Sequence, residues 1–252
     1  MNYLYRGGIY LALFIFFPVI TFAQSRNTLE FGSGLLLQGN RNHLISPLRY
    51  TGSTLPVSAG YRREKPKYSI TIEGFFSDHK LHSGLSSGYN HTQKDLDARL
   101  RIGYLRNIAS FGGGKGMFII GAYHDVMLNL QKQYYTPDDI EHFIDVSVSL
   151  VDIASGFRYN LSSNHIFHDI FDITILNLGL RTPYFGLRRN LDTYFEFPGQ
   201  FFKITEKFSY QYRFSRFINL RVLYLFTYYR YKTPFHNRSL YQNVLIRFGV
   251  RI

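Results

Sequence analysis

Apolar and polar residues alternate along most of this 252-residue chain after residue 28, which predicts β-strands with one apolar and one polar face. The chain ends on such a run: positions 244, 246, 248, 250 and 252 are apolar, and Arg247 and Arg251 lie between them. A strand at the end of a sheet exposes unpaired backbone groups, and pairing the first strand with the last removes that edge. We therefore predict an all-β fold, a closed antiparallel transmembrane β-barrel with lipid outside and a polar lumen.

The N-terminal residues have the pattern of an export signal. Arg6 is followed by an apolar run at residues 9–20 and by the small-residue segment Thr21-Phe22-Ala23. This apolar run is about a dozen residues long, whereas a membrane-spanning helix needs about 20. We predict a cleaved signal peptide at residues 1–23 and an outer-membrane β-barrel domain at residues 24–252, with a retained N-terminal anchor as the alternative.

Composition indicates the environment and the partners that are expected for the chain. Aromatic residues make up 18% of it, which is consistent with aromatic girdles at the two membrane interfaces. The chain has no cysteine, which excludes disulfides, thiolate metal sites and lipoprotein processing. The formal net charge of +12 favours outer-membrane lipid head groups and lipopolysaccharide phosphates as partners. Nucleic acid is not an expected partner of an exported chain.

Ten alternating runs are long enough to cross a bilayer as tilted strands. They are predicted at residues 29–38, 54–63, 67–80, 93–106, 116–130, 142–160, 165–181, 199–214, 217–232 and 239–252. The connections between them alternate between long and short, as expected for long outer loops and short periplasmic turns, and an even count places both termini in the periplasm. Eight or twelve strands are the alternatives if residues 182–198 contain a hairpin or one run is not a strand.

Three places depart from regular alternation. Glu206 falls among the lipid-facing residues of its strand and is an unexplained exception. In the run 142–160 the polar positions change from odd to even near Leu150-Val151. The run 165–181 changes phase near Ile175-Leu176. One extra residue at each of these two places predicts a β-bulge.

Charges of both signs fall on the predicted lumen face. They are expected to pair across the narrow interior, because buried charge is costly when it is unpaired. The predicted network comprises Arg62, Glu73, Asp95, Asp97, Arg99, Arg101, Asp145, Arg158, Arg213, Arg221, Arg247 and Arg251. Six further charged residues are predicted to face the lumen: Asp125, Asp152, Asp172, Arg181, Lys203 and Lys207. These residues are interpreted either as the polar filling of a narrow barrel or as the lining of a constricted channel that prefers anions.

Candidate catalytic residues are His79, His82 and Asp95, which lie around a predicted outer loop. Histidines beside a carboxylate activate a water or a serine for hydrolysis, and solvated loop side chains are the alternative interpretation. No cofactor and no metal site are predicted. His165 and His168 are three residues apart, a spacing that places them on opposite faces of a strand.

Four segments carry a resemblance to a known group of proteins: residues 22–24, 46–50, 60–63 and 247–252. Through them the chain resembles outer-membrane β-barrel proteins of the Bacteroidota type, although it matches no characterised subfamily. The resemblance covers the mature chain. It implies the barrel fold, a place in the cell outer membrane reached through the periplasm, and recognition of the final strand by the barrel-assembly machinery.

Two classes of function follow from the sequence. The first is a narrow channel, or an accessory subunit of an outer-membrane transport or secretion assembly. The second is a hydrolase at the outer rim that acts on lipid, lipopolysaccharide or peptide. Because the sequence contains no motif of the known outer-membrane proteases or phospholipases, the first class is favoured.

Overall fold

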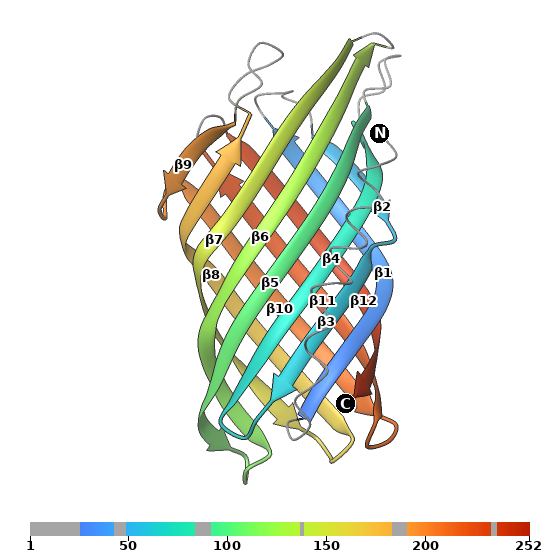
Figure 1. Cartoon of the computed structure of the whole chain (residues 1–252), viewed down its shortest axis with the longest axis vertical. Coiled ribbons are helices and arrows are strands. Elements are labelled where there is room, and N and C mark those ends of the chain that lie inside the picture. Colours follow the sequence, from blue (N-terminus) through green and yellow to red (C-terminus); the bar gives the residue numbers. More distant parts are fainter. Residues whose placement is uncertain (1–25, 43–48, 84–91, 137–138, 183–190, 233–235) are drawn as a thin grey trace.

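The fold is a closed antiparallel β-barrel whose strands are strongly tilted (Figure 1). The computed structural model describes residues 26–42, 49–83, 92–136, 139–182, 191–232 and 236–252. The expected signal peptide, residues 1–23, lies outside these residues. The strands are β1 (Arg26–Asn42), β2 (Tyr50–Thr54), β3 (Val57–Glu64), β4 (Tyr68–Ser83), β5 (Thr92–Phe111), β6 (Gly116–Thr136), β7 (Asp139–Asn160), β8 (His165–Arg181), β9 (Asp192–Glu196), β10 (Phe201–Arg213), β11 (Ile218–Tyr231) and β12 (Asn237–Arg251).

Pairing of the first and last strands closes the barrel. The β1–β12 ladder runs from Thr28↔Arg251 to Asn42↔Asn237. The remaining antiparallel ladders join strands that are adjacent in sequence, except for β1–β3, β2–β4 and β8–β10, which each skip one short strand. The all-β closed barrel predicted from the sequence is confirmed, and the edge of the final strand is covered by β1.

Two positions around the barrel are each occupied by two short strands. Both β2 and β3 pair with β1 and with β4, and Pro56, which has no backbone N–H to donate, lies between them. Both β9 and β10 pair with β8, and the chain turns between them through Gly199 at a positive φ of 108°. The sequence predicted ten strands, whereas the structure has twelve, which occupy ten positions around the barrel. Of the segment 182–198, the described residues 191–198 contribute β9, which extends the position of β10.

The two faces of the strands follow the sequence pattern. On β5, Asp95 and Arg101 are buried in the lumen, whereas Leu100 and Ile102 are each 43% exposed on the outer face. The β7–β8 ladder shifts register on both sides of Val151, which pairs with Leu176 while Asp152 pairs with Thr174. Both predicted β-bulges are therefore confirmed, and each returns the polar residues to the lumen.

The outer surface carries an apolar band of membrane thickness. On the outer face of β5 an apolar run lies between Lys94 and Arg106. The eleven residues between them, when tilted, span roughly 25 Å, the height of the lipid-facing band of such barrels. No helix in the described part of the chain is long and apolar enough to cross a membrane.

The two ends of the barrel differ in their connections. Short turns at residues 65–67, 112–115, 161–164 and 214–217 define what we call the short-turn end, where the C-terminus also lies (Figure 1). We call the opposite end the long-loop end. Short turns face the periplasm in outer-membrane barrels, so the long-loop end corresponds to the cell exterior.

Two apolar clusters lie inside the lumen. One lies toward the long-loop end and consists of Leu36, Phe201, Tyr229, Tyr231 and Tyr241. The other lies toward the short-turn end and consists of Leu105, Ile119, Tyr123, Ala154 and Ile170. The lumen is thus packed with side chains, and most of its charged groups lie between and around these clusters.

Candidate functional site

The central part of the lumen is crossed by a network of buried charges. Lys203 on β10 donates to Asp125 on β6 and to Asp152 on β7, each at 2.8 Å. Arg99 on β5 donates from Nε to Asp125 Oδ1 at 2.8 Å, and from Nη1 to Thr227 on β11 at 2.9 Å. These contacts join opposite walls of the barrel, so they obstruct the axis.

A second buried network lies closer to the short-turn end. Lys207 donates to Glu73 Oε2 at 2.5 Å, and Arg247 donates to Glu73 Oε1 at 2.9 Å. Arg62 and Arg221 both donate to Glu30, at 3.1 and 3.2 Å. Each carboxylate here has at least two cationic partners, which offset the cost of removing the charges from water.

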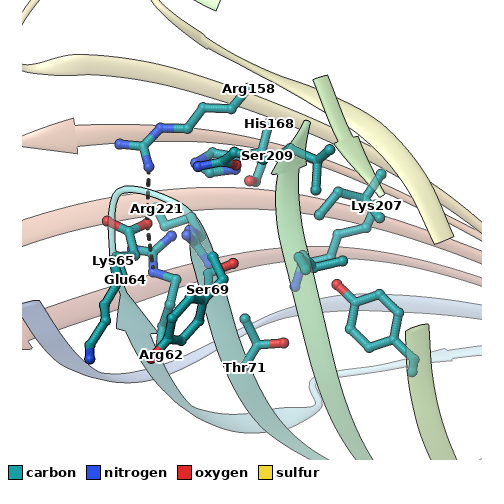
Figure 2. Close-up of a pocket in the computed structure, with 16 residues that line it drawn as sticks. Arg62, Glu64, Lys65, Ser69, Thr71, Arg158, His168, Lys207, Ser209 and Arg221 are labelled. Atoms are coloured by element: carbon teal, nitrogen blue, oxygen red, sulfur yellow. Dashed lines mark ion pairs between the residues drawn. The ribbon is translucent and has the colours of Figure 1, made fainter. Parts of the chain in front are cut away.

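At the short-turn end the charges enclose a small cavity (Figure 2). Glu64 lies between Arg62, 3.4 Å away, and Arg158, 3.5 Å away, as the dashed lines in Figure 2 show. The cavity has a volume of about 30 Å³, and His168 and Lys207 also line it. Two further cavities along the described lumen have volumes of about 20 and 10 Å³. Such volumes hold only a few waters.

Toward the long-loop end one arginine holds two carboxylates. Arg181 donates to Asp145 Oδ1 at 3.0 Å and to Glu196 Oε1 at 2.7 Å. Its guanidinium also stacks on the ring of Tyr231, 3.6 Å from the ring centroid. A bidentate, stacked arginine is a strong partner for two buried acids, and this group is electrostatically satisfied.

Two buried carboxylates in the lumen lack such a partner. Among the lumen-facing carboxylates that the structure describes, only those of Asp95 and Asp97 have no Lys or Arg within 4.0 Å. Asp95 is 0% exposed and Asp97 7% exposed. The two side chains are two residues apart on β5, so they point to the same side of the sheet.

His79 completes this group. It lies directly opposite Asp95 in the β4–β5 ladder, and its Nε2 is 3.9 Å from Asp97 Oδ2. One ligand atom from each of the three residues lies within 4.8 Å of the others. We refer to His79, Asp95 and Asp97 as the His–Asp–Asp cluster.

Neutral side chains supply part of the cluster's hydrogen bonding. Gln93 and Gln38 donate to the two oxygens of Asp95, at 2.6 and 3.0 Å. Asn129 and Tyr241 donate to Asp97 Oδ1. Asp97 Oδ2 and both ring nitrogens of His79 have no hydrogen-bond partner among the described residues. These three atoms are therefore available to form a hydrogen bond or to ligate an ion.

The structure places the predicted catalytic candidates in two separate environments. His79 and Asp95 come together as expected, but inside the lumen wall, where the His79 side chain is only 1% exposed. His82 is exposed on the outer face of β4, because it is an odd number of residues from His79. His82 therefore lies apart from the other two, and Asp97 takes its place in the group.

The predicted lumen charges lie on the lumen side of the wall. Nine of the twelve form ion pairs with described lysine, arginine, aspartate or glutamate side chains: Arg62, Glu73, Arg99, Arg101, Asp145, Arg158, Arg213, Arg221 and Arg247. Asp97 lies 3.9 Å from His79. Asp95 accepts only from amides. Arg251 donates to the backbone carbonyl of Arg216 at 3.4 Å.

Three carboxylates of the networks were missed by the sequence analysis. Glu64 and Glu196 fell in segments assigned to a turn and a loop, although they lie on β3 and β9. Glu30 is buried on β1, next to the outward-facing Phe31. Phe31 and Leu35 are apolar residues at odd positions of this strand, so the alternation of the sequence already indicates that Glu30, at an even position, faces the lumen.

The outer face carries its own exceptions to the apolar pattern. Glu206 on β10 is exposed and pairs across the ladder with Phe171 on β8. Two residues before Phe171 on β8, Asp169 also points outward, and its Oδ1 has no partner among the described residues. Gln242 on β12 lies on the same side of the barrel. We refer to Asp169, Glu206 and Gln242 as the outer polar patch.

No protein-family model and no curated protein sequence matches the chain. The outer-membrane protease OmpT from Escherichia coli superposes with a TM-score of 0.63 at 7% identity, over 93% of this chain and 99% of that one. The fold therefore defines the chain as an outer-membrane β-barrel.

Two other solved barrels are similar at a lower level. The translocator domain of the autotransporter NalP from Neisseria meningitidis gives a TM-score of 0.39 at 8% identity, covering 98% of this chain and 96% of that one. The toluene transporter TodX from Pseudomonas putida gives 0.37 at 8% identity, with 90% of each chain covered. These superpositions are too distant to bear on function.

Proposed function

We propose that the protein is a non-conducting outer-membrane barrel that acts as an accessory subunit of an outer-membrane assembly. The observation that carries the proposal is the filled lumen: Lys203, Arg99 and Lys207 each reach across it to carboxylates or hydroxyls on other walls. An open pore needs a continuous water-filled path through the lumen. Buried ion pairs of this kind block such a path and are costly to separate. This argument favours the accessory role over the narrow, anion-preferring channel.

The outer polar patch supports the accessory role. Charged residues on a lipid-facing surface are destabilising, and acyl chains offer no hydrogen bonds to Asp169 or Glu206. A neighbouring membrane protein with cationic or hydrogen-bond-donating side chains at this depth satisfies both carboxylates. We therefore assign the face formed by β8, β10, β11 and β12 to that partner.

Conductance and co-purification test the proposal. The purified chain is expected to give no current steps in a planar bilayer in which a general porin, used as the positive control, conducts. After mild detergent extraction it is expected to co-purify with a second outer-membrane protein, and Glu206→Leu is expected to abolish this association. The matched control Ile102→Val, on the outer face of β5, retains it. Regular current steps, or recovery of this chain alone, would overturn the proposal.

The outer leaflet is the second proposed partner of the barrel surface. Arg238 pairs across the ladders with Arg41 and with Arg230, near the long-loop end. Lys94 pairs in the same way with Lys80 and Lys132. Like charges directly opposite one another are destabilising. Phosphate groups of lipopolysaccharide lie at this level of the membrane and offset the repulsion.

A hydrolase is the second candidate function, favoured by the meeting of His79 with Asp95 and Asp97, which lie inside the lumen wall and not at the outer rim expected from the sequence. Histidine–carboxylate groups serve as general bases for hydrolysis. The test is activity toward lipid, lipopolysaccharide and peptide substrates in wild type, His79→Ala and Asp95→Ala. Activity that is unchanged by both substitutions rules this candidate out.

The Bacteroidota origin suggested by the sequence resemblance is likewise a proposal.

A further inference from the structure

We propose that the His–Asp–Asp cluster binds one divalent transition-metal ion, of the Zn²⁺ or Mn²⁺ class, in the wall of the lumen. The proposal is independent of the accessory role. It rests on three features of the cluster: its surplus negative charge, its unpartnered histidine, and the chemistry and spacing of its donor atoms.

The surplus charge is the first feature. Every other described carboxylate in the lumen has a lysine or arginine partner, but Asp95 and Asp97 have only neutral donors around them. Two carboxylates buried on one face of β5 repel each other in a medium that screens poorly. A bound divalent cation neutralises both at once.

The histidine is the second feature and is independent of the carboxylates. The His79 side chain is 1% exposed, and neither of its ring nitrogens has a hydrogen-bond partner among the described side chains and backbone. A buried imidazole normally donates from one nitrogen and accepts at the other. Here Nε2 points toward Asp97 Oδ2, which is also unpartnered, at 3.9 Å. A metal ion between these two atoms satisfies both.

The donor set is the third feature. One imidazole nitrogen with two carboxylates suits zinc or manganese, since imidazole favours transition metals and carboxylate tolerates them. The ligand atoms lie within 4.8 Å of one another, and a tetrahedral ion at about 2.0–2.2 Å requires separations of roughly 3.5 Å. Rotation of the two aspartate side chains shortens the separations between the ligand atoms to those of a tetrahedral site. The unpartnered Gln38 Oε1 and Asn129 Oδ1 provide nearby acceptors for a metal-bound water.

Zinc binding to the full chain tests the proposal. The barrel is purified in detergent without a histidine tag, stripped with a chelator, and titrated with ZnCl₂ by calorimetry. Because the cluster is closed to solvent, a second sample is refolded with zinc and its metal content measured. One zinc per chain is expected. Asp97→Asn and His79→Gln are each expected to weaken binding by more than about 100-fold, since changes outside the ligand set alone cost 10–100-fold.

Controls separate ligation from misfolding and from surface binding. His82→Gln removes an exposed histidine on the same strand and is expected to leave the zinc affinity unchanged. The heat-dependent shift in gel mobility reports whether each variant forms the barrel. If a variant fails to fold, the ligands are identified in the wild-type protein instead, with Co²⁺ bound in place of zinc. The visible absorption spectrum of the bound Co²⁺ is expected to show one nitrogen ligand together with oxygen ligands.

Three results would overturn the proposal. One is the absence of stoichiometric zinc after both titration and refolding, which would leave a shared proton as the means of relieving the repulsion. Another is one-to-one binding that survives both Asp97→Asn and His79→Gln. The third is displacement of zinc by an equal concentration of Mg²⁺, because a site with an imidazole ligand discriminates against that ion.

Discussion

The two ends of the lumen differ in the sign of their surplus charge. Toward the long-loop end the described side chains include four carboxylates and one arginine: Asp95, Asp97, Asp145, Glu196 and Arg181. Toward the short-turn end they include three carboxylates and seven cations: Glu30, Glu64, Glu73, Arg62, Arg158, Lys207, Arg213, Arg221, Arg247 and Arg251.

The two surpluses differ in their access to water. The side chains of Arg158 and Arg213 are 19% and 21% exposed at the mouth of the short-turn end. Asp95, in contrast, is fully buried. Surplus charge that reaches solvent is hydrated at little cost, whereas buried surplus charge needs a partner, a proton or an ion. The difference explains why the basic end is consistent with a purely structural role and the acidic end is a candidate site.

The largest effect is expected from breaking a balanced network. Lys203→Met leaves Asp152 without any cation among its described neighbours and Asp125 with one fewer. Removing one partner of a buried pair typically costs about 3–5 kcal/mol. We expect the free energy of unfolding in lipid vesicles, followed by circular dichroism during urea titration, to fall by this amount. Wild-type stability in this variant would show that the network is hydrated.

The His–Asp–Asp cluster is expected to respond in the opposite direction. In the presence of a chelator, Asp97→Asn removes a buried charge that has no cation, and should raise the free energy of unfolding by about 1–3 kcal/mol. The matched control Asp152→Asn removes a paired charge and should lower it. Equal signs for the two substitutions in the same urea titration would contradict the comparison.

A lone carboxylate on the outer face provides the next test. Glu206→Leu replaces an exposed charge in the apolar band, flanked by Phe171 and Phe226, with a lipid-compatible side chain. A gain of about 1–2 kcal/mol is expected in pure lipid vesicles, since lipid-facing acids cost less than the roughly 2–4 kcal/mol of Arg or Lys. The same substitution should disrupt the complex with a partner protein. A loss of stability in vesicles would indicate that Glu206 has an unrecognised intramolecular role.

The smallest effect on stability is expected at the exposed arginines and lysines that face one another across the ladders near the long-loop end. Arg238→Ala should change the free energy of unfolding by less than about 0.5 kcal/mol, because the side chain is exposed. It should nevertheless lower the amount of lipopolysaccharide that co-purifies with the barrel, measured as lipid A by mass spectrometry. Arg251→Ala at the opposite end serves as the control and should leave that amount unchanged.

The fold could be predicted from the sequence because a barrel strand has a period of two residues. Alternation alone assigned Asp95 and Arg101 to the lumen and Leu100 to lipid, and a change of phase located the bulge at Val151. Turn and loop segments carry no such period, which is why Glu64 and Glu196 were missed. Their strands are set by pairing with neighbours rather than by their own composition.

The pairing of charges could not be predicted in the same way. Lys203 meets Asp125 across 78 residues of sequence, and Arg221 meets Glu30 across 191. Which side chains meet depends on the stagger of every ladder between them and on how far the barrel curves. The sequence listed the charges on the lumen face, but not which would remain without a partner.

The sequence by itself therefore determined the alternating faces, the ten barrel positions and the closure of the first strand on the last, because each depends on local periodicity or on the need to cover an edge. The tertiary structure alone decided that Asp95, Asp97 and His79 form a buried group without a cation while the other lumen acids are neutralised. That distinction arises from the register between β4 and β5 and from the reach of side chains across a narrow interior, which are properties of the closed barrel and not of any single strand.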